Sequence, residues 1–207
     1  MAIEKKSKYD LDGSDSKMGA ITEREFDEAV SPKGIVSKKP TKTQDKYNGV
    51  DRILTYPLII DKTDYIQIKS QGACDDDLYC IPIGLKMGND VVNRGIFDER
   101  WDANLFAFER ASYNEFVVIR TKKLREFIRE KYDIRRQTSY KESSQKHRKV
   151  YIRVLGRKKD FLVYLSQKDF EDIGIEGVYH KNNDRPSGIN SVEELPSWLD
   201  HRNVENL

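Results

Sequence analysis

Hydrophobic and β-branched residues concentrate in two neighbouring segments, residues 50–60 and 65–70, separated by the polar run Asp61-Lys62-Thr63-Asp64. Two such segments around turn-forming residues predict a β-hairpin. Because side chains on a strand alternate between its two faces, Gln67 and Lys69 are expected on one face of the second strand. Two polar side chains therefore share one side of the predicted hairpin.

Asp51, at the start of the first predicted strand, would join these two side chains only if the connection has the right length. A two-residue turn would place Asp51 on the opposite face from Gln67 and Lys69. We therefore expect a three-residue turn or a β-bulge, for which Pro57 is a marker. An acid, an amide carbonyl and an ammonium brought together in this way can hold a divalent metal beside an activated water.

The remaining pattern predicts further strands and helices. Apolar residues near helical spacing indicate a helix at 18–30, which Ser31-Pro32-Lys33-Gly34 ends. The other expected elements are strands at 78–87, 105–108 and 116–120, a helix at 122–132, and a hairpin of strands 150–155 and 161–165. Residues 35–48, rich in Lys, Thr and Pro, are expected to be a connecting loop.

Three of these segments together resemble the PD-(D/E)XK nuclease superfamily. The first is Asp51 followed by the hairpin and Gln67-Ile68-Lys69. The second is Lys17–Phe26, KMGAITEREF, which looks like the first-helix motif of archaeal Holliday-junction resolvases. The third runs from Trp101 to Lys131 and is similar to the later strands and closing helix of that core. The resemblance implies an α/β fold with a restriction-endonuclease-like core, a mixed central β-sheet flanked by helices.

The resemblance also implies a catalytic site. Glu23 and Asp51 would supply carboxylates to a Mg²⁺, for which Mn²⁺ is a substitute, and the side chain of Gln67 and the backbone carbonyl of Ile68 would complete the ligands. Lys69 would orient or deprotonate the attacking water. The superfamily usually carries Asp or Glu where this chain has Gln67, so a weaker metal site is expected. The other interpretation of Glu23 is an ordinary solvated helix acid.

Composition changes this picture in only a few respects. The chain has 207 residues, 35% of them charged, with a net charge of +2, which is typical of a globular protein and argues against a membrane span. The N-terminal segment lacks the apolar stretch of a signal peptide, and the two cysteines, Cys74 and Cys80, have no histidine nearby. We therefore expect a cytoplasmic protein with reduced thiols.

Positive charge is concentrated in one region. Residues 121–160 contain fifteen Lys and Arg against five Asp and Glu. We expect this region to contact DNA, with a solubilising surface loop as the alternative. The candidate DNA-binding residues are Arg135, Arg136, Lys141, Lys146, Arg148, Lys149, Arg157, Lys158 and Lys159. The chain is thus expected to comprise an N-terminal arm (1–16), a nuclease core (17–133) and a basic C-terminal extension containing the hairpin (134–207).

These features lead to three functional hypotheses. The first is a Mg²⁺-dependent DNA endonuclease, a homodimer that makes sequence-specific double-strand cuts in the manner of a restriction enzyme, because two cuts need two centres. The second is a Holliday-junction resolvase acting on branched DNA. The third is a non-catalytic DNA-binding protein on a nuclease scaffold.

Overall fold

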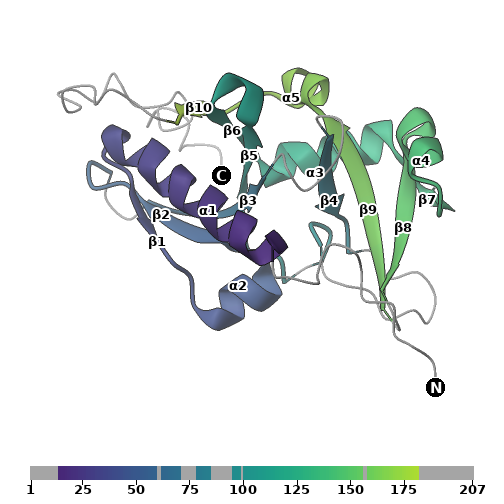
Figure 1. Ribbon diagram of the computed structural model, residues 1–207, viewed down its shortest axis with the longest axis horizontal. Helices are drawn as coiled ribbons and strands as arrows, with labels where there is room; N and C mark the ends of the chain where they lie inside the picture. Colours follow the sequence, from purple (N-terminus) through teal and green to yellow (C-terminus); the bar gives the residue numbers. More distant parts are fainter. Residues whose placement is uncertain are drawn as a thin grey trace.

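The computed structural model describes residues 14–59, 62–70, 78–84, 95–98, 100–155 and 158–181. Its architecture is α/β, with two mixed β-sheets flanked by helices (Figure 1). The expected arm lies outside the described residues apart from residues 14–16, which belong to helix α1 (Ser14–Val30). Residues 182–207 also lie outside the described part.

The first sheet has the strand order β1-β2-β3-β5-β6-β10. Strands β3 and β5 are parallel, and the other neighbours are antiparallel. Both β5 and β6 are buried on both faces, which is why their sequences are continuously hydrophobic. The strands are β1 (Val36–Lys38), β2 (Arg52–Thr55), β3 (Thr63–Lys69), β5 (Leu105–Arg110), β6 (Glu115–Arg120) and β10 (Gly177–His180).

The second sheet has the order β4-β9-β8-β7, with β7 parallel to β8 and the other pairs antiparallel. Its strands are β4 (Leu78–Pro82), β7 (Asp133–Thr138), β8 (Lys149–Leu155) and β9 (Lys158–Ser166). Strand β4 lies at one edge, as expected for a strand that ends in a proline. The predicted hairpin at 150–165 is β8 and β9, and β9 begins earlier than expected.

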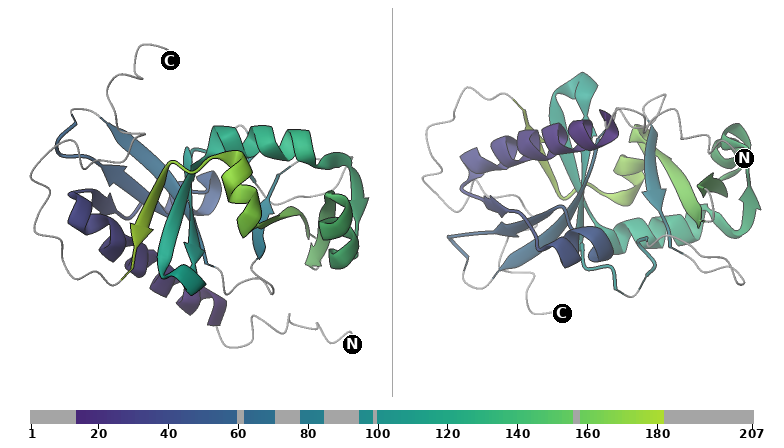
Figure 2. Two further views of the ribbon diagram at one scale, coloured as in Figure 1. Left: turned by 90° about the horizontal axis from the view of Figure 1, so that it is seen from above. Right: turned by 60° about the horizontal axis from the view of Figure 1, so that its bottom comes forward.

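Two hydrophobic cores hold the layers together. The first, which we call the α1 core, lies between α1 and one face of the first sheet and contains Phe26, Val30, Leu54, Ile66 and Phe116 among others. The Phe26 and Phe116 rings meet edge to face, 5.3 Å apart. Helix α1 follows that face of the sheet, and α3 (Thr121–Lys131) covers the other (Figure 2).

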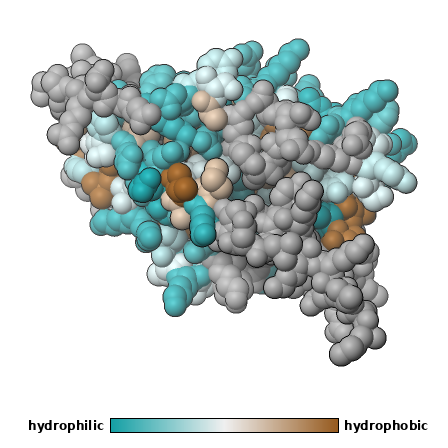
Figure 3. Space-filling view, in the orientation of Figure 1, coloured by the Kyte–Doolittle hydropathy of each residue, from teal (hydrophilic) through white to brown (hydrophobic). Residues whose placement is uncertain are grey.

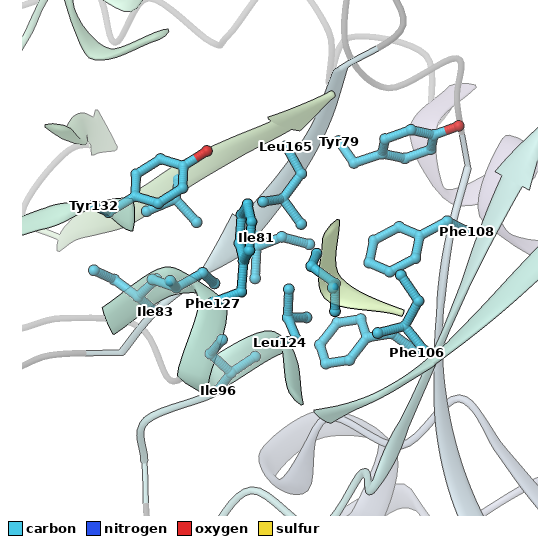
Figure 4. Packing of buried hydrophobic residues seen from close by; sticks show 14 of the residues in the cluster. Tyr79, Ile81, Ile83, Ile96, Phe106, Phe108, Leu124, Phe127, Tyr132 and Leu165 are labelled. Carbon is cyan, nitrogen blue, oxygen red and sulfur yellow. The ribbon is translucent and has the colours of Figure 1, made fainter. Parts of the chain in front are cut away.

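The second core, which we call the inter-sheet core, joins the opposite face of the first sheet to α3 and the second sheet. Phe106 and Phe108 of β5, Leu124 of α3, and Ile81 and Leu165 of the second sheet pack in it (Figure 4). The expected boundary at residue 133 therefore does not separate two cores. In addition, β10 extends the first sheet beside β6, so the C-terminal segment contributes to both sheets.

Three sequence-based expectations differ from the structure. Residues 35–48 were expected to form a loop, but they contain β1 and helix α2 (Lys42–Asn48), which begins with a capping box between Thr41 and Gln44. The first strand of the site hairpin ends at Thr55 rather than Ile60. The basic segment 135–149 contains β7 and helix α4 (Lys141–His147) although it has no hydrophobic period. These elements are short and mostly exposed, so their burial leaves little trace in the sequence.

Surface properties agree with the charged composition. Hydrophilic residues predominate among the coloured residues of the face drawn in Figure 3, and hydrophobic ones appear only in small patches. None of the helices in the described ranges has the length and hydropathy that crossing a membrane requires.

Two glycines provide a test of the packing between β4 and the 95–98 segment. A Cβ on Gly95 would lie 2.3 Å from the backbone oxygen of Pro82, whereas a Cβ on Gly19 of α1 would meet nothing within 4 Å. We expect Gly95→Ala to lower the free energy of unfolding by about 3 kcal/mol, because backbone must move. Gly19→Ala should raise it by about 1 kcal/mol through helix propensity. Urea denaturation measures both, and equal stability of the two variants would contradict this packing.

Candidate functional site

A cavity of about 500 Å³ opens where the first sheet approaches the second. Helix α1, the start of β2 and the end of β3 line one side of it. Strand β4 and the β8–β9 hairpin line the other. The lining residues are Gly19, Thr22, Glu23, Asp51, Gln67, Ile68, Lys69, Ser70, Cys80, Pro82, Arg153, Asp160 and Leu162. All four predicted catalytic residues, Glu23, Asp51, Gln67 and Lys69, therefore line one cavity.

The register of β2 against β3 brings Asp51 to Gln67. Arg52 pairs with Ile66, so Asp51, one residue earlier, stands opposite Gln67. One oxygen of the Asp51 carboxylate, Oδ2, accepts hydrogen bonds from Gln67 Nε2 at 2.5 Å and from the backbone N–H of Ile68 at 2.7 Å. The connection between β2 and β3 is the seven residues 56–62, and the register of the two strands has no shift, so the expected three-residue turn or β-bulge was wrong. A connection with an odd number of residues nevertheless places Asp51 on the same face as Gln67.

Burial makes the Asp51 carboxyl electrostatically unusual. Removal from water is the largest cause of a rise in its pKa from 3.8 to about 6. The positive charge of Lys69 and the Ile68 hydrogen bond oppose that rise, and the negative charges of Glu23 and Asp45 add to it. Asp51 is thus a partly buried acid with only partial compensation, the situation expected where a cation would be favourable.

Glu23 lies on helix α1, and a buried arginine on β2, Arg52, holds its side chain at the cavity. Arg52, 4% exposed, donates from Nε to both oxygens of Asp27, at 2.9 and 3.0 Å, and from Nη1 to Glu23 Oε2 at 2.5 Å. The same Nη1 donates to the backbone oxygen of Asp51 at 2.8 Å. Arg52 therefore fixes the α1 acids beside the start of β2.

Sequence reasoning missed Arg52 and Asp27. A signal was present, because Arg52 occupies the buried face of β2 together with Leu54, and a charged residue at such a position requires a partner. The identity of that partner depends on how α1 docks and could not be predicted from the local pattern.

The donor set of the cavity suits a hard divalent cation, with few anionic ligands. It offers the carboxylates of Asp51 and Glu23, the side-chain oxygen of Gln67 and the backbone carbonyl of Ile68, all of them oxygen ligands of the type Mg²⁺ prefers. Among the described residues, no group of three or more His, Cys, Asp or Glu side chains is positioned to hold a metal. Gln67 directs its amide nitrogen to Asp51, which leaves its oxygen as the side chain's metal-binding atom.

Two residues that sequence reasoning did not select, Arg153 and Asp160, lie on the wall formed by the second sheet. They are directly opposite each other on β8 and β9, and Arg153 donates from Nε and Nη2 to Asp160 Oδ2 at 3.0 and 2.7 Å. A cross-strand Arg–Asp pair could have been predicted once the hairpin register was known. Its placement on the cavity depends on the packing of the two sheets.

The predicted DNA-binding residues lie elsewhere. Arg135, Arg136 and Lys146 are exposed on β7 and α4, at the edge of the second sheet farthest from β4. Lys149, at the start of β8, is partly buried. Arg157 lies outside the described residues, as do the side chains of Lys141, Lys158 and Lys159. None of the predicted residues in the described ranges lines the cavity.

Arg148 has a structural role that the prediction did not foresee. Its guanidinium forms two hydrogen bonds to Asp169, at 2.6 and 3.0 Å, and one to the Tyr132 hydroxyl at 2.7 Å. Asp169 is buried and also accepts hydrogen bonds from the backbone N–H and the hydroxyl of Ser166 at the start of α5 (Gln167–Ile173). Arg148 therefore holds α4, α3 and α5 together, and we assign it to the fold.

No protein-family model matches this chain, and no curated protein or solved structure shows significant similarity to it.

The raised pKa of Asp51 predicts that the free energy of unfolding depends on pH. Between about pH 4 and pH 6 the folded protein retains a proton that the unfolded chain has lost, so stability falls as the pH rises and the full cost persists above pH 6. A shift of about two units corresponds to about 3 kcal/mol. We expect Asp51→Asn, which removes the charge, to raise the free energy of unfolding by up to that amount at pH 8 and to change little at pH 4.

Urea denaturation at the two pH values, without added metal, measures this effect. Asp172→Asn on the exposed surface of α5 is the matched control and should change stability by less than about 0.5 kcal/mol at either pH. A destabilised Asp51→Asn variant at pH 8 would show that the carboxylate is well compensated in the folded protein.

Arg52 is expected to stabilise the fold more than any exposed ion pair. Arg52→Met removes the hydrogen bonds to Asp27 and Glu23 and should lower the free energy of unfolding by about 3 kcal/mol. Arg24→Met is the control, because Arg24 pairs with Glu28 on the same helix with both side chains about 70% exposed, and it should cost less than about 0.5 kcal/mol. Thermal and urea unfolding measure both, and similar losses would contradict the assigned role of Arg52.

Proposed function

We propose that this protein is a Mg²⁺-dependent DNA endonuclease. The observation that carries the proposal is the meeting of Glu23, Asp51, Gln67 and Lys69, from α1 and the β2–β3 hairpin, around one cavity. Two acids, an amide oxygen and an ammonium at one place are the parts needed for metal-assisted phosphodiester hydrolysis.

The topology supports a restriction-endonuclease-like core for this site. Antiparallel β2–β3 is followed by β5 parallel to β3, and α1 and α3 cover opposite faces of the sheet. This is the arrangement expected of a mixed sheet with its site at the hairpin. One departure lies between β3 and β5 in the sequence, where the chain forms β4, a strand of the second sheet.

Each residue of the candidate site has a distinct part in the proposed reaction. A bound Mg²⁺ would polarise the scissile phosphate and stabilise the charge that develops on its oxygens. Asp51 and Glu23 would supply negative charge, and Gln67 and the Ile68 carbonyl neutral oxygens. Lys69 would orient or deprotonate the attacking water on the approach side of the phosphate.

Charge on the second sheet supports DNA as the substrate. Arg135, Arg136 and Lys146 are exposed beyond the cavity and can neutralise phosphates or contact base edges. A homodimer would place two cavities on one duplex and allow cuts in both strands. Sequence-specific cleavage of the restriction type is therefore the first proposal, with branched DNA as the alternative substrate.

A second candidate function is DNA binding without catalysis. One observation favours it. The Asp51 carboxylate accepts a hydrogen bond from the Gln67 amide and the Glu23 carboxylate accepts one from Arg52, so both proposed anionic ligands already have partners in the protein. In this interpretation Gln67 marks the loss of metal affinity.

Incubation of the purified protein with supercoiled plasmid and with a synthetic four-way junction separates these functions. With Mg²⁺ or Mn²⁺, but not EDTA, an endonuclease produces discrete bands and a resolvase symmetric junction nicks, while a binder only shifts the DNA. Lys69→Ala should lower the cleavage rate by about 10³-fold, within the range for a proton-transfer group. Lys168→Ala, an exposed lysine on α5, is the control.

An unchanged rate for Lys69→Ala, with the control also unchanged, would remove Lys69 from the mechanism. Absence of cleavage by the wild type with either metal on either substrate would overturn the catalytic proposal.

A further inference from the structure

The wall of the cavity opposite Asp51 and Lys69 carries a positive group that the proposed mechanism does not use. Arg153 reaches this wall from β8, in the second sheet. Its side chain is 51% exposed, whereas its partner Asp160 is 5% exposed. Both side chains line the cavity, and the cation is the more exposed member of the pair.

Asp160 holds the guanidinium by one edge. Both Nε and Nη2 of Arg153 donate to the same oxygen, Asp160 Oδ2. Nη1 takes no part in these two bonds. Two hydrogen bonds to a buried acceptor fix the plane of a side chain that would otherwise carry about 2 kcal/mol of rotamer entropy. The arginine is therefore preorganised, with one nitrogen directed away from its partner.

We propose that Arg153 binds a phosphate group of the DNA strand that occupies the cavity, and that Asp160 is its positioning residue. This inference rests on the proposed function and extends it, because it places the substrate strand between the two sheets. Arg153 contacts the phosphate from the second sheet while Lys69 and Asp51 act from the first. A planar guanidinium is well suited to this role, since its donors match the spacing of phosphate oxygens.

The lining carries the acids Glu23, Asp51 and Asp160 against Lys69 and Arg153, so the case for a phosphate at this wall rests on the position of Arg153 and not on the charge of the cavity as a whole. Glu23, Asp51 and the proposed metal lie on the side of the first sheet, so the reacting phosphate is held there. A DNA strand has further phosphates on either side of the reacting one. A cation that binds one of them should not also pair with the carboxylates that would hold the metal. Arg153 is such a cation, because its guanidinium is hydrogen-bonded to Asp160 and not to Glu23 or Asp51.

An Arg–Asp pair across a hairpin also has a purely structural explanation, which the variants must separate. Arg153→Gln alone would leave the buried Asp160 without its partner and could impair folding. The double variant Arg153→Gln/Asp160→Asn removes both charges together. Arg153→Lys keeps the charge and loses the planar fork. Asp160→Asn keeps Arg153 and loses its orientation.

Arg100→Gln is the matched control. Arg100 is 59% exposed, forms two hydrogen bonds to Asp98 at 3.0 and 3.1 Å, and does not line the cavity. It therefore reproduces the charge, the exposure and the acidic partner of Arg153 at another place. Thermal unfolding of every variant establishes that the fold is retained before DNA is added.

Two measurements test the inference. The first is the affinity for a short labelled duplex in EDTA, from about 50 to 200 mM salt, where each lost phosphate contact reduces the slope of log K against log salt by about 0.9. The double variant should show that reduction, while Arg153→Lys, Asp160→Asn and the control keep the wild-type slope. The second is cleavage with Mg²⁺, where Arg153→Lys and Asp160→Asn should each lose about tenfold in kcat/KM, a loss that a merely structural pair would not cause.

The outcomes distinguish this inference from the proposed function. If the wild type cleaves DNA and the double variant matches it in salt slope and in kcat/KM, Arg153 does not contact phosphate and only the inference is overturned. If the wild type does not cleave, the proposed function fails and the salt slope decides alone. A slope reduced by the double variant and not by the control supports the phosphate contact, and an unreduced slope overturns it.

Discussion

The register of β2 against β3 is the constraint on which the candidate site depends. Pairing of Arg52 with Ile66 places Asp51 opposite Gln67 and directs Arg52 toward α1. Because side chains alternate along a strand, one register sets both results. A slip of one residue would bury Asp51 against α1 and turn Arg52 toward the cavity, which would remove the acid from the site and separate Asp27 from Arg52.

The two sheets share one hydrophobic core, and residues of both line the cavity. Strand β4 lies between β3 and β5 in the sequence but pairs with β9 in the second sheet, and the inter-sheet core packs Phe106 and Phe108 against residues of both sheets. Late in the chain, β10 returns to the first sheet, and the Lys181 ammonium contacts Glu109 and, at 2.7 Å, Glu25 of α1. The cavity therefore has two walls whose separation is fixed by a shared hydrophobic core.

The Asp51 carboxylate in the cavity lowers the stability of the protein when no ligand is bound. Asp51 is desolvated and only partly compensated by Lys69, which raises its pKa to about 6. Folding usually avoids such groups, because a buried charge without a full partner lowers stability. Clusters of perturbed ionisable residues in a cavity are typical of functional sites, where a ligand supplies the missing charge. The proposed cation would do so here.

Much of the fold could be predicted from local pattern. The helix at α1, the strands β5 and β6, helix α3 and the β8–β9 hairpin all follow from apolar spacing, because their buried faces are long enough to show a period. Short exposed elements such as β1, α2, β7 and α4 carry no such signal, and none of them was predicted. For α2, the capping box at Thr41 was the one available indication.

By itself, the sequence determined which side chains could share a face: Gln67 with Lys69 through strand periodicity, and Glu23 beside the apolar stripe of α1. It could not decide which faces would meet. The length of the β2–β3 connection, the docking of α1 through Arg52 and the approach of the β8–β9 hairpin with Arg153 and Asp160 all depend on contacts between residues far apart in the chain. Local patterns record burial but not the partner that provides it, so the second wall of the cavity was decided only by the tertiary structure.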